Sequence, residues 1–383
     1  DTADSLSTLM DLDIFTENDL KQPGPFGYTA IMWAAAFSQH VTDYIITNKL
    51  VSKDDFWKGI NGNSIDPLMI ACELGSNSSA VILKSDYMEE KYYNKAYHKN
   101  YTPDMVILGK NLELGKTFLE SKYCTLDSIN TKKNSNNKML LHIMVTVNYN
   151  AAKYLLTHDY IDQRSLLHEW DGQFNTKHNI MSISIKLPDL IKEIVNHKDY
   201  INKLLTFVSG NVPLIYSFLS FPKSFEYILN NLDDDILNTK YTDHTLLTYS
   251  CTKNLGTVEM IINHPKFTQE MFNYKYKNKN CFELLKTVMY KSIHAINTNA
   301  NALIKSKFVN KEFLGTDADI VKLVKLDNSI GPALLRHHKI SNSSLIDHGI
   351  VAKNVVKLPI YYWILKKHND KLAIVKLLFE NYE

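Results

Sequence analysis

The chain has 383 residues and a nearly balanced charge, with 43 Lys and Arg residues against 41 Asp and Glu residues. This balance gives no electrostatic case for a nucleic-acid partner or a membrane-surface partner. A single hydrophobic core rarely serves so long a chain, so the length predicts either several domains or a stack of small repeated units.

The first 22 residues carry the end of a pattern that recurs along the chain. Met10 is followed four residues later by Ile14, and six residues after that by Leu20. We therefore expect residues 1–22 to be a partial N-terminal repeat and the chain to be a fragment of a longer protein. An ordinary trimmed end repeat is the alternative.

Each complete copy of the pattern is marked by the second residue of an apolar pair, which we call the ruler residue. Ruler residues recur at intervals of about 37 residues, a period typical of helical repeats. Apolar residues follow five of them at the same offsets, as Leu50 and Phe56 follow Ile46, and the copies at Val195, Leu229 and Ile262 slip by one residue. The pattern predicts an all-α helical-repeat solenoid of roughly ten helix-turn-helix units, each with a short apolar turn after its second helix. The ruler residues are Ile46, Leu83, Leu119, Leu156, Val195, Leu229, Ile262, Ile304, Leu335 and Leu378.

A second signature precedes most ruler residues and predicts the start of the first helix of each unit. Thr or Asp accepts hydrogen bonds from the free N–H groups of a helix start, and Pro is tolerated at the first helical position. We expect Gly75 and Gly256 to form turns between the first and second helices. Examples of the signature are Asp66-Pro67-Leu68, Thr102-Pro103-Asp104 and Met139-Leu140-Leu141-His142.

These openings resemble the Thr-Pro-Leu-His-x-Ala motif of ankyrin repeats, and the resemblance covers nearly the whole chain. Only His142 clearly occupies the family's His position, and the repeats exceed the family's usual length of about 33 residues. The resemblance implies a curved solenoid that binds protein on its concave side. The Asn- and Tyr-rich repeats are similar to the ankyrin-like families of giant DNA viruses, which implies the host cytoplasm as the location. Their tails have the form of Leu119-Glu120-Ser121-Lys122-Tyr123-Cys124.

The predicted solenoid occupies residues 1–383 as a single domain. Regular repeats are expected at 23–285, an irregular repeat with an insertion at 286–335, and C-terminal repeats at 336–383. Residues 297–301, which read Asn-Thr-Asn-Ala-Asn, are predicted to form a loop insertion.

Motifs for catalysis are missing from the sequence. It has no Gly-rich phosphate loop, no His-Glu-x-x-His and no Gly-x-Ser-x-Gly, so we expect no enzyme activity, cofactor or metal. The four cysteines lack metal-ligand spacing, and Cys72 and Cys251 stand at small-residue positions of helices, so buried reduced thiols are expected. Nothing resembles a signal peptide and no apolar run is long enough to span a membrane, so we expect an intracellular protein.

The sequence is therefore interpreted as a protein-interaction scaffold whose partner binds the first helices and the loops, or fingers, that precede them. Aromatic and basic residues of the fingers are the candidate contacts, because aromatic anchors commonly dominate interface energy. For each Tyr, packing between fingers is the alternative. The candidates are Phe26, Tyr28, Lys99, Tyr101, Lys132, Lys133, Tyr241 and Tyr274.

Two other functions remain open at this point. One is the substrate-recognition part of a ubiquitin-ligase adaptor, with its box domain outside these residues. The other is a virion-associated structural protein that self-assembles, since open repeat ends favour stacking between molecules.

Overall fold

The structure, a computed structural model, is mostly helical, which confirms the all-α fold class. It forms two compact units, Asp1–Ser184 and Ile185–Glu383, and each is considered by itself. The single solenoid over residues 1–383 stays a prediction. The structure describes residues 8, 16–24, 27–58, 65–172, 176–209, 212–232, 234–288, 293–309, 313, 350–351 and 357–358.

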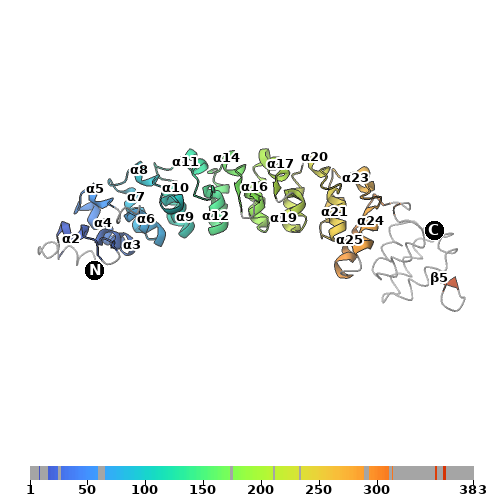
Figure 1. The fold of residues 1–383 in the computed structure, drawn as a ribbon, viewed down its shortest axis with the longest axis horizontal. Helices are drawn as coiled ribbons and strands as arrows, with labels where there is room; N and C mark the ends of the chain where they lie inside the picture. The colour runs from blue at the N-terminus through green and yellow to red at the C-terminus, as the bar shows by residue number, and fades with distance from the viewer. Residues whose placement is uncertain are drawn as a thin grey trace. The chain divides into compact units, whose positions relative to one another are not determined.

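The first unit is built from successive sets of three helices (Figure 1). The first helices of these sets are α3 (Ala30–Phe37), α6 (Pro67–Leu74), α9 (Pro103–Lys110), α12 (Leu140–Val147) and α15 (Ile180–Ser184). The second helices are α4 (Gln39–Thr47), α7 (Ser78–Lys84), α10 (Leu112–Leu119) and α13 (Tyr149–Thr157). The third helices are α2 (Glu17–Lys21), α5 (Lys53–Phe56), α8 (Glu90–Tyr93), α11 (Leu126–Thr131) and α14 (Gln163–Leu166). A 3₁₀ turn, η2 (His98–Asn100), and the strands β1 (Trp170–Asp171) and β2 (Lys177–His178) complete the unit.

Helices of one kind pack beside each other from one set to the next. The first helices from α3 to α15 contact each other in order, and so do α4, α7 and α10. The third helices α5, α8, α11 and α14 lie along one edge of the unit (Figure 1). The short apolar turn predicted after each second helix is therefore a short third helix.

The second unit repeats this arrangement. Its first helices are α18 (Leu214–Phe218), α21 (Leu246–Lys253) and α24 (Cys281–Val288). Its second helices, which contact each other in order, are α16 (Pro188–Val195), α19 (Pro222–Leu229), α22 (Val258–Ile262) and α25 (Ile293–Lys305). The third helices are α17 (Lys198–Thr206), α20 (Asp234–Leu237) and α23 (Gln269–Asn273). Two-stranded pairs are formed by β3 (Val208–Ser209) with β4 (Val212–Pro213), and by β5 (Ile350–Val351) with β6 (Lys357–Leu358).

The predicted loop insertion at residues 297–301 is wrong, because these residues lie inside α25. Asn299 is buried there, and its side-chain amide donates to the Leu255 carbonyl at 2.9 Å. Ala300 and Leu303 are buried on the same helix. This part of the Asn-rich stretch forms a helix because the Asn299 amide is satisfied by tertiary contacts and its apolar neighbours are buried, which overrides low helix propensity. Most of the predicted C-terminal repeats at 336–383 lie outside the described residues.

The ruler residues mark the buried end of each second helix. Every ruler residue from Ile46 to Ile304 is buried. The apolar residues of the third helices are buried as well, among them Phe56, Tyr93 and Leu166. Fully burying such a side chain stabilises the fold by about 1.5–3 kcal/mol. The spacing of the ruler residues in the sequence is therefore also the spacing of buried residues along the described core.

Capping residues explain where the first helices begin and end. The side chains of Thr29 and Asp66 accept backbone N–H groups of α3 and α6, at 3.3 Å and 3.0 Å. Gly75 ends α6 with φ of 64°, in the left-handed region where a glycine is favoured, as predicted for this turn. In the matching turn of the second unit Asn254 takes the left-handed position, with φ of 53°, and Gly256 follows it.

Tyrosine hydroxyls tie neighbouring repeats of the first unit together. Tyr87 donates to the Val51 carbonyl at 2.6 Å, and one repeat later Tyr123 donates to the Met88 carbonyl at 2.9 Å. Both tyrosines stand four residues after a ruler residue. Each bond satisfies a backbone carbonyl of the segment that leads into a third helix.

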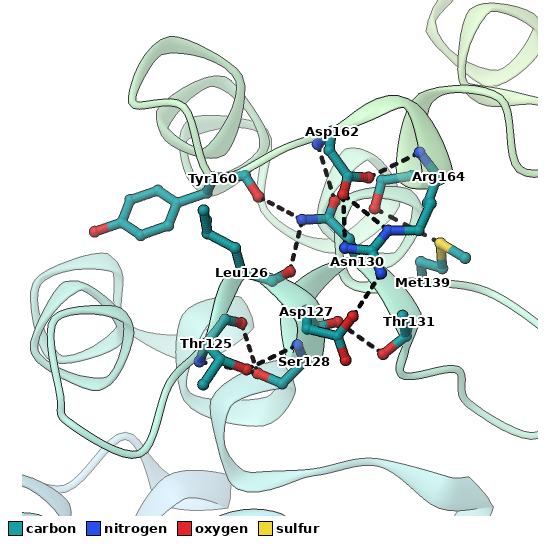
Figure 2. A network of polar contacts seen from close by, with 11 residues as sticks. Thr125, Leu126, Asp127, Ser128, Asn130, Thr131, Met139, Tyr160, Asp162 and Arg164 are labelled. Atoms are coloured by element: carbon teal, nitrogen blue, oxygen red, sulfur yellow. Dashed lines mark hydrogen bonds and ion pairs between the residues drawn. The ribbon is translucent and has the colours of Figure 1, made fainter.

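Asn130 of α11 makes the next such connection (Figure 2). Its side-chain amide donates to the Leu126 carbonyl at 2.8 Å and to the Tyr160 carbonyl at 2.9 Å, while its Oδ1 accepts the Asp162 N–H at 3.1 Å. Arg164 contacts both Asp127 at 2.5 Å and Asp162 at 2.7 Å. These contacts join α11 to α14 across one repeat boundary.

Cys72, Cys251 and Cys281 are buried free thiols, which confirms the predicted burial for these three, whereas Cys124 is only half-buried. Burial raises the pKa of the Cys72 and Cys251 thiols well above the usual value. Among the described residues, no helix combines the length and apolar character that crossing a bilayer requires.

Candidate protein-binding surface

A finger is the segment that joins a third helix to the next first helix. Most fingers are closed by a short antiparallel pairing, such as Lys133 with Met139, Tyr241 with His244, and Tyr276 with Lys279. The finger before α9 is closed by a hydrogen bond of 2.9 Å from the Tyr97 N–H to the Tyr101 carbonyl. This pairing fixes the direction in which finger side chains leave the backbone.

Buried ion pairs hold the fingers of the first unit against the first helices. Asp66, which is fully buried, accepts a hydrogen bond from the Tyr97 hydroxyl and lies 3.1 Å from the Lys95 ammonium. One repeat later, buried Asp104 lies 3.8 Å from Lys132. Removing one partner of such a pair leaves an uncompensated charge, which costs several kcal/mol.

Two of the predicted contact residues belong to this packing. Lys132 lies 5.1 Å from the ring centroid of Tyr93, and its Nζ is enclosed. Tyr101 is half-buried, and its hydroxyl accepts a hydrogen bond of 3.2 Å from the Asn134 amide of the next finger. Lys132 thus packs against helices α8 and α9, and Tyr101 contacts the next finger.

The other predicted contact residues divide into exposed cations and half-buried rings. Lys99 and Lys133 are exposed. Tyr241 packs against the Tyr216 ring at 5.4 Å, while Tyr274 donates a hydrogen bond of 3.0 Å to the Asp243 carbonyl. Phe26, the remaining candidate apart from Tyr28, lies outside the described residues.

At the start of α12, a cluster of histidine and tryptophan rings takes the place that a buried ion pair has at the starts of α6 and α9. The His142 ring lies 4.5 Å from the Trp170 ring and 5.4 Å from the His168 ring. The Nδ1 atom of His142 accepts the Met139 N–H at 3.3 Å and caps the helix start. Burial lowers the pKa of His142 to about 3, with a smaller contribution from His168, so the ring is neutral at pH 7.

The first helices of the first unit present a row of exposed apolar residues that the sequence analysis missed. Phe37, Leu74 and Val147 stand at the same repeat position, at the ends of α3, α6 and α12, and are 69%, 56% and 60% exposed. Trp33 is also exposed and stacks on Phe37 at a centroid distance of 5.5 Å. We call Trp33, Phe37, Leu74 and Val147 the apolar row.

The apolar row is interrupted at the intervening helix α9, where an exposed lysine stands in the row position. Lys110 holds the equivalent position there, and its Cβ lies 3.7 Å from the place that a Cβ on Gly75 would take. Val147 packs over Gly109, where an added Cβ would meet the Val147 Cγ1 at 3.2 Å. The predicted contact residue Tyr28 adjoins the row, since its ring lies 5.6 Å from Trp33.

The sequence does contain a signal for the row. Phe37, Leu74 and Val147 are apolar residues at the ends of first helices, where a polar residue is expected before the turn, and Trp33 lies one turn before Phe37. The helix-start signature ends before Phe37, Leu74 and Val147, so it makes no prediction for them. Comparison with known proteins adds no assignment: no protein-family model matches the chain, and no curated protein matches it.

Proposed function

We propose that this chain is a non-enzymatic scaffold of ankyrin-like helical repeats, stacked as a solenoid, that binds a protein partner on its first helices. The ordered packing of first helices from α3 to α15 supports this proposal, because stacked units form an extended binding surface. The observation that carries it is the apolar row, with Phe37, Leu74 and Val147 more than half exposed.

The energetics of the row favour a protein partner. Covering one large apolar side chain is worth about 1.5–3 kcal/mol, so several such residues on one surface can anchor a complex. Interface cores are depleted in charge and enriched in aromatic residues, which matches Trp33 and Phe37. The exposed cations Lys99 and Lys133 lie on fingers and would belong to a polar rim.

The test is a double substitution, Phe37→Ser with Leu74→Ser, compared with Leu126→Ser. Leu126 is a matched control because it is 57% exposed in the same unit but lies on a third helix. All three positions are exposed, so stability should change by no more than about 0.5 kcal/mol per site. The full chain is expressed with an affinity tag, and co-purified proteins are quantified by mass spectrometry.

A protein that is retained by wild type and Leu126→Ser but lost by the double variant supports the proposal, once the purified pair shows the same loss by calorimetry. Equal recovery from all three forms contradicts it. Ubiquitin-ligase components among the lost proteins would specify a substrate adaptor. Loss of copies of this chain alone would instead specify self-assembly, which sedimentation at increasing concentration would show.

A further inference from the structure

Two neighbouring fingers of the second unit, residues 240–245 and 274–280, carry a concentration of rings and cations. We call them the basic finger pair. Each turns through two successive residues of positive φ: Thr242 and Asp243 at 46° and 63°, and Lys277 and Asn278 at 48° and 61°. Two such residues between paired positions are typical of a tight hairpin turn that twists with its flanking strands. The finger tips are therefore fixed in shape.

Ring contacts and hydrogen bonds hold the basic finger pair together. The His244 ring stacks on the Tyr276 ring at a centroid distance of 3.5 Å, which joins the two hairpins face to face. The Tyr274 hydroxyl donates to the Asp243 carbonyl at 3.0 Å. The Tyr216 hydroxyl donates to the His244 carbonyl at 2.6 Å and anchors the first hairpin to α18.

Three ammonium groups lie over rings of this cluster. Lys240 lies 4.4 Å from the Tyr274 centroid, and Lys277 lies 5.3 Å from the Tyr276 centroid. Lys253, from the last turn of α21, lies 5.9 Å from the Tyr249 centroid. A cation over a ring face is attracted by about 0.5–1 kcal/mol at an exposed site, so the rings restrict where these charges reside.

Among the described residues, the lysines of the cluster have no carboxylate within ion-pair distance. Two more lysines, Lys275 and Lys279, are exposed on the second finger. Within the described residues, none of the five lysines of the cluster forms an ion pair. Only Asp243 supplies a carboxylate at the finger tips, and it is exposed. The charge of the cluster is therefore strongly positive.

A buried histidine at the centre of the cluster also has unused hydrogen-bonding capacity. His244 is 6% exposed, and its Nδ1 has no hydrogen-bond partner among the described residues. Burial lowers the pKa of His244, and the nearby ammonium groups of Lys253 and Lys277 lower it further, while Asp243 acts in the opposite direction. A buried polar atom without a partner is uncommon in folded proteins and calls for a ligand or a functional role.

We propose that the basic finger pair binds a carboxylate-rich segment of a protein partner. Lys240, Lys253 and Lys277 supply ammonium groups at restricted positions, which suits carboxylates presented along a peptide. Single-stranded nucleic acid requires free aromatic faces for base stacking. Here the Tyr276 face is stacked against His244, and the Tyr274 and Tyr249 rings each carry an ammonium group. This site uses none of the residues of the apolar row, so it stands independently of the function proposed above.

The experiment measures binding of the full chain to a fluorescein-labelled Glu-Ser repeat peptide by fluorescence anisotropy. The peptide should bind at low salt and be released as salt rises, because exposed charges are screened. Replacing all three ring-bound lysines by Gln (K240Q, K253Q and K277Q) should weaken binding at least about tenfold, as expected for three partly exposed charge contacts. The matched control replaces three exposed lysines of the first unit, K84Q, K110Q and K122Q, and should bind as wild type does.

Circular dichroism of both triple variants establishes that they keep wild-type helical content and melting temperature. The proposal is overturned if the two triple variants bind the peptide equally. It is also overturned if a labelled oligothymidine of equal charge binds the wild type more tightly than the peptide does, since that result would assign the cluster to nucleic acid. Because K240Q, K253Q and K277Q leave the first unit unchanged, a negative result here leaves the scaffold proposal unaffected.

Discussion

Replacing Asn130 with Ala should destabilise the first unit by about 2–3 kcal/mol, because it removes the connection between α11 and α14. The Asn130 side chain is fully buried and bonds the Tyr160 carbonyl at 2.9 Å and the Asp162 N–H at 3.1 Å (Figure 2). Each of these half-buried backbone groups loses its partner in the variant, at about 1–1.5 kcal/mol apiece. The small cavity left by the amide adds to this loss.

The assay is urea denaturation of the full chain, followed by circular dichroism and tryptophan fluorescence. Trp170 is buried in the finger that follows α14, so its fluorescence reports on this part of the unit. Thr131→Ala is the control on the same helix, since Thr131 is exposed and donates only to the Asp127 carbonyl at 2.7 Å. The control should change the free energy of unfolding by no more than about 0.5 kcal/mol. If Asn130→Ala changes it as little, the reasoning about repeat contacts is refuted.

Three further predictions concern buried groups of the first unit. Ala71→Glu places an unpaired charge at a position that is 0% exposed, so it should unfold its repeat; full helical content and melting temperature in circular dichroism would show that the position is misassigned. Tyr87→Phe removes the hydroxyl that bonds the Val51 carbonyl and should cost about 1 kcal/mol in urea denaturation; an unchanged midpoint would count against the tyrosine contact. Since burial holds the pKa of His142 near 3, the unfolded state takes up the proton as pH falls below about 6.5. Wild type should therefore lose about 2 kcal/mol more stability between pH 7 and pH 5 than His142→Gln loses, and parallel pH curves for the two proteins would exclude this effect.

The period of the fold was predictable because the apolar residues that form the core recur at the same period in the sequence. Ile46, Leu83 and the equivalent ruler residues are buried at the ends of second helices. A polar residue at such a position would remove the stabilisation that burying an apolar side chain gives to the core. The third helices were predicted only as short apolar turns. A helix of four residues such as α5 has too few positions to show a helical period, although its buried Phe56 was identified.

The candidate surface was predictable only in part. Tyr28 was chosen as an aromatic finger residue, and it does adjoin the apolar row through Trp33. The ion pair of Asp104 with Lys132 joins residues of different repeats, and sequence pattern alone does not show which finger cation turns inward. Phe37 and Leu74 look like ordinary helical apolar residues until the exposed fraction of each side chain is known.

Site-specific photocrosslinking tests most directly whether first helices bind protein. Benzoylphenylalanine is introduced in place of Leu74, or in place of Leu126 as the equally exposed control, and cells that express the full chain are irradiated. We predict a discrete protein adduct from position 74 and none from position 126. Equal adducts from both positions, or none from position 74, would contradict the proposed binding surface.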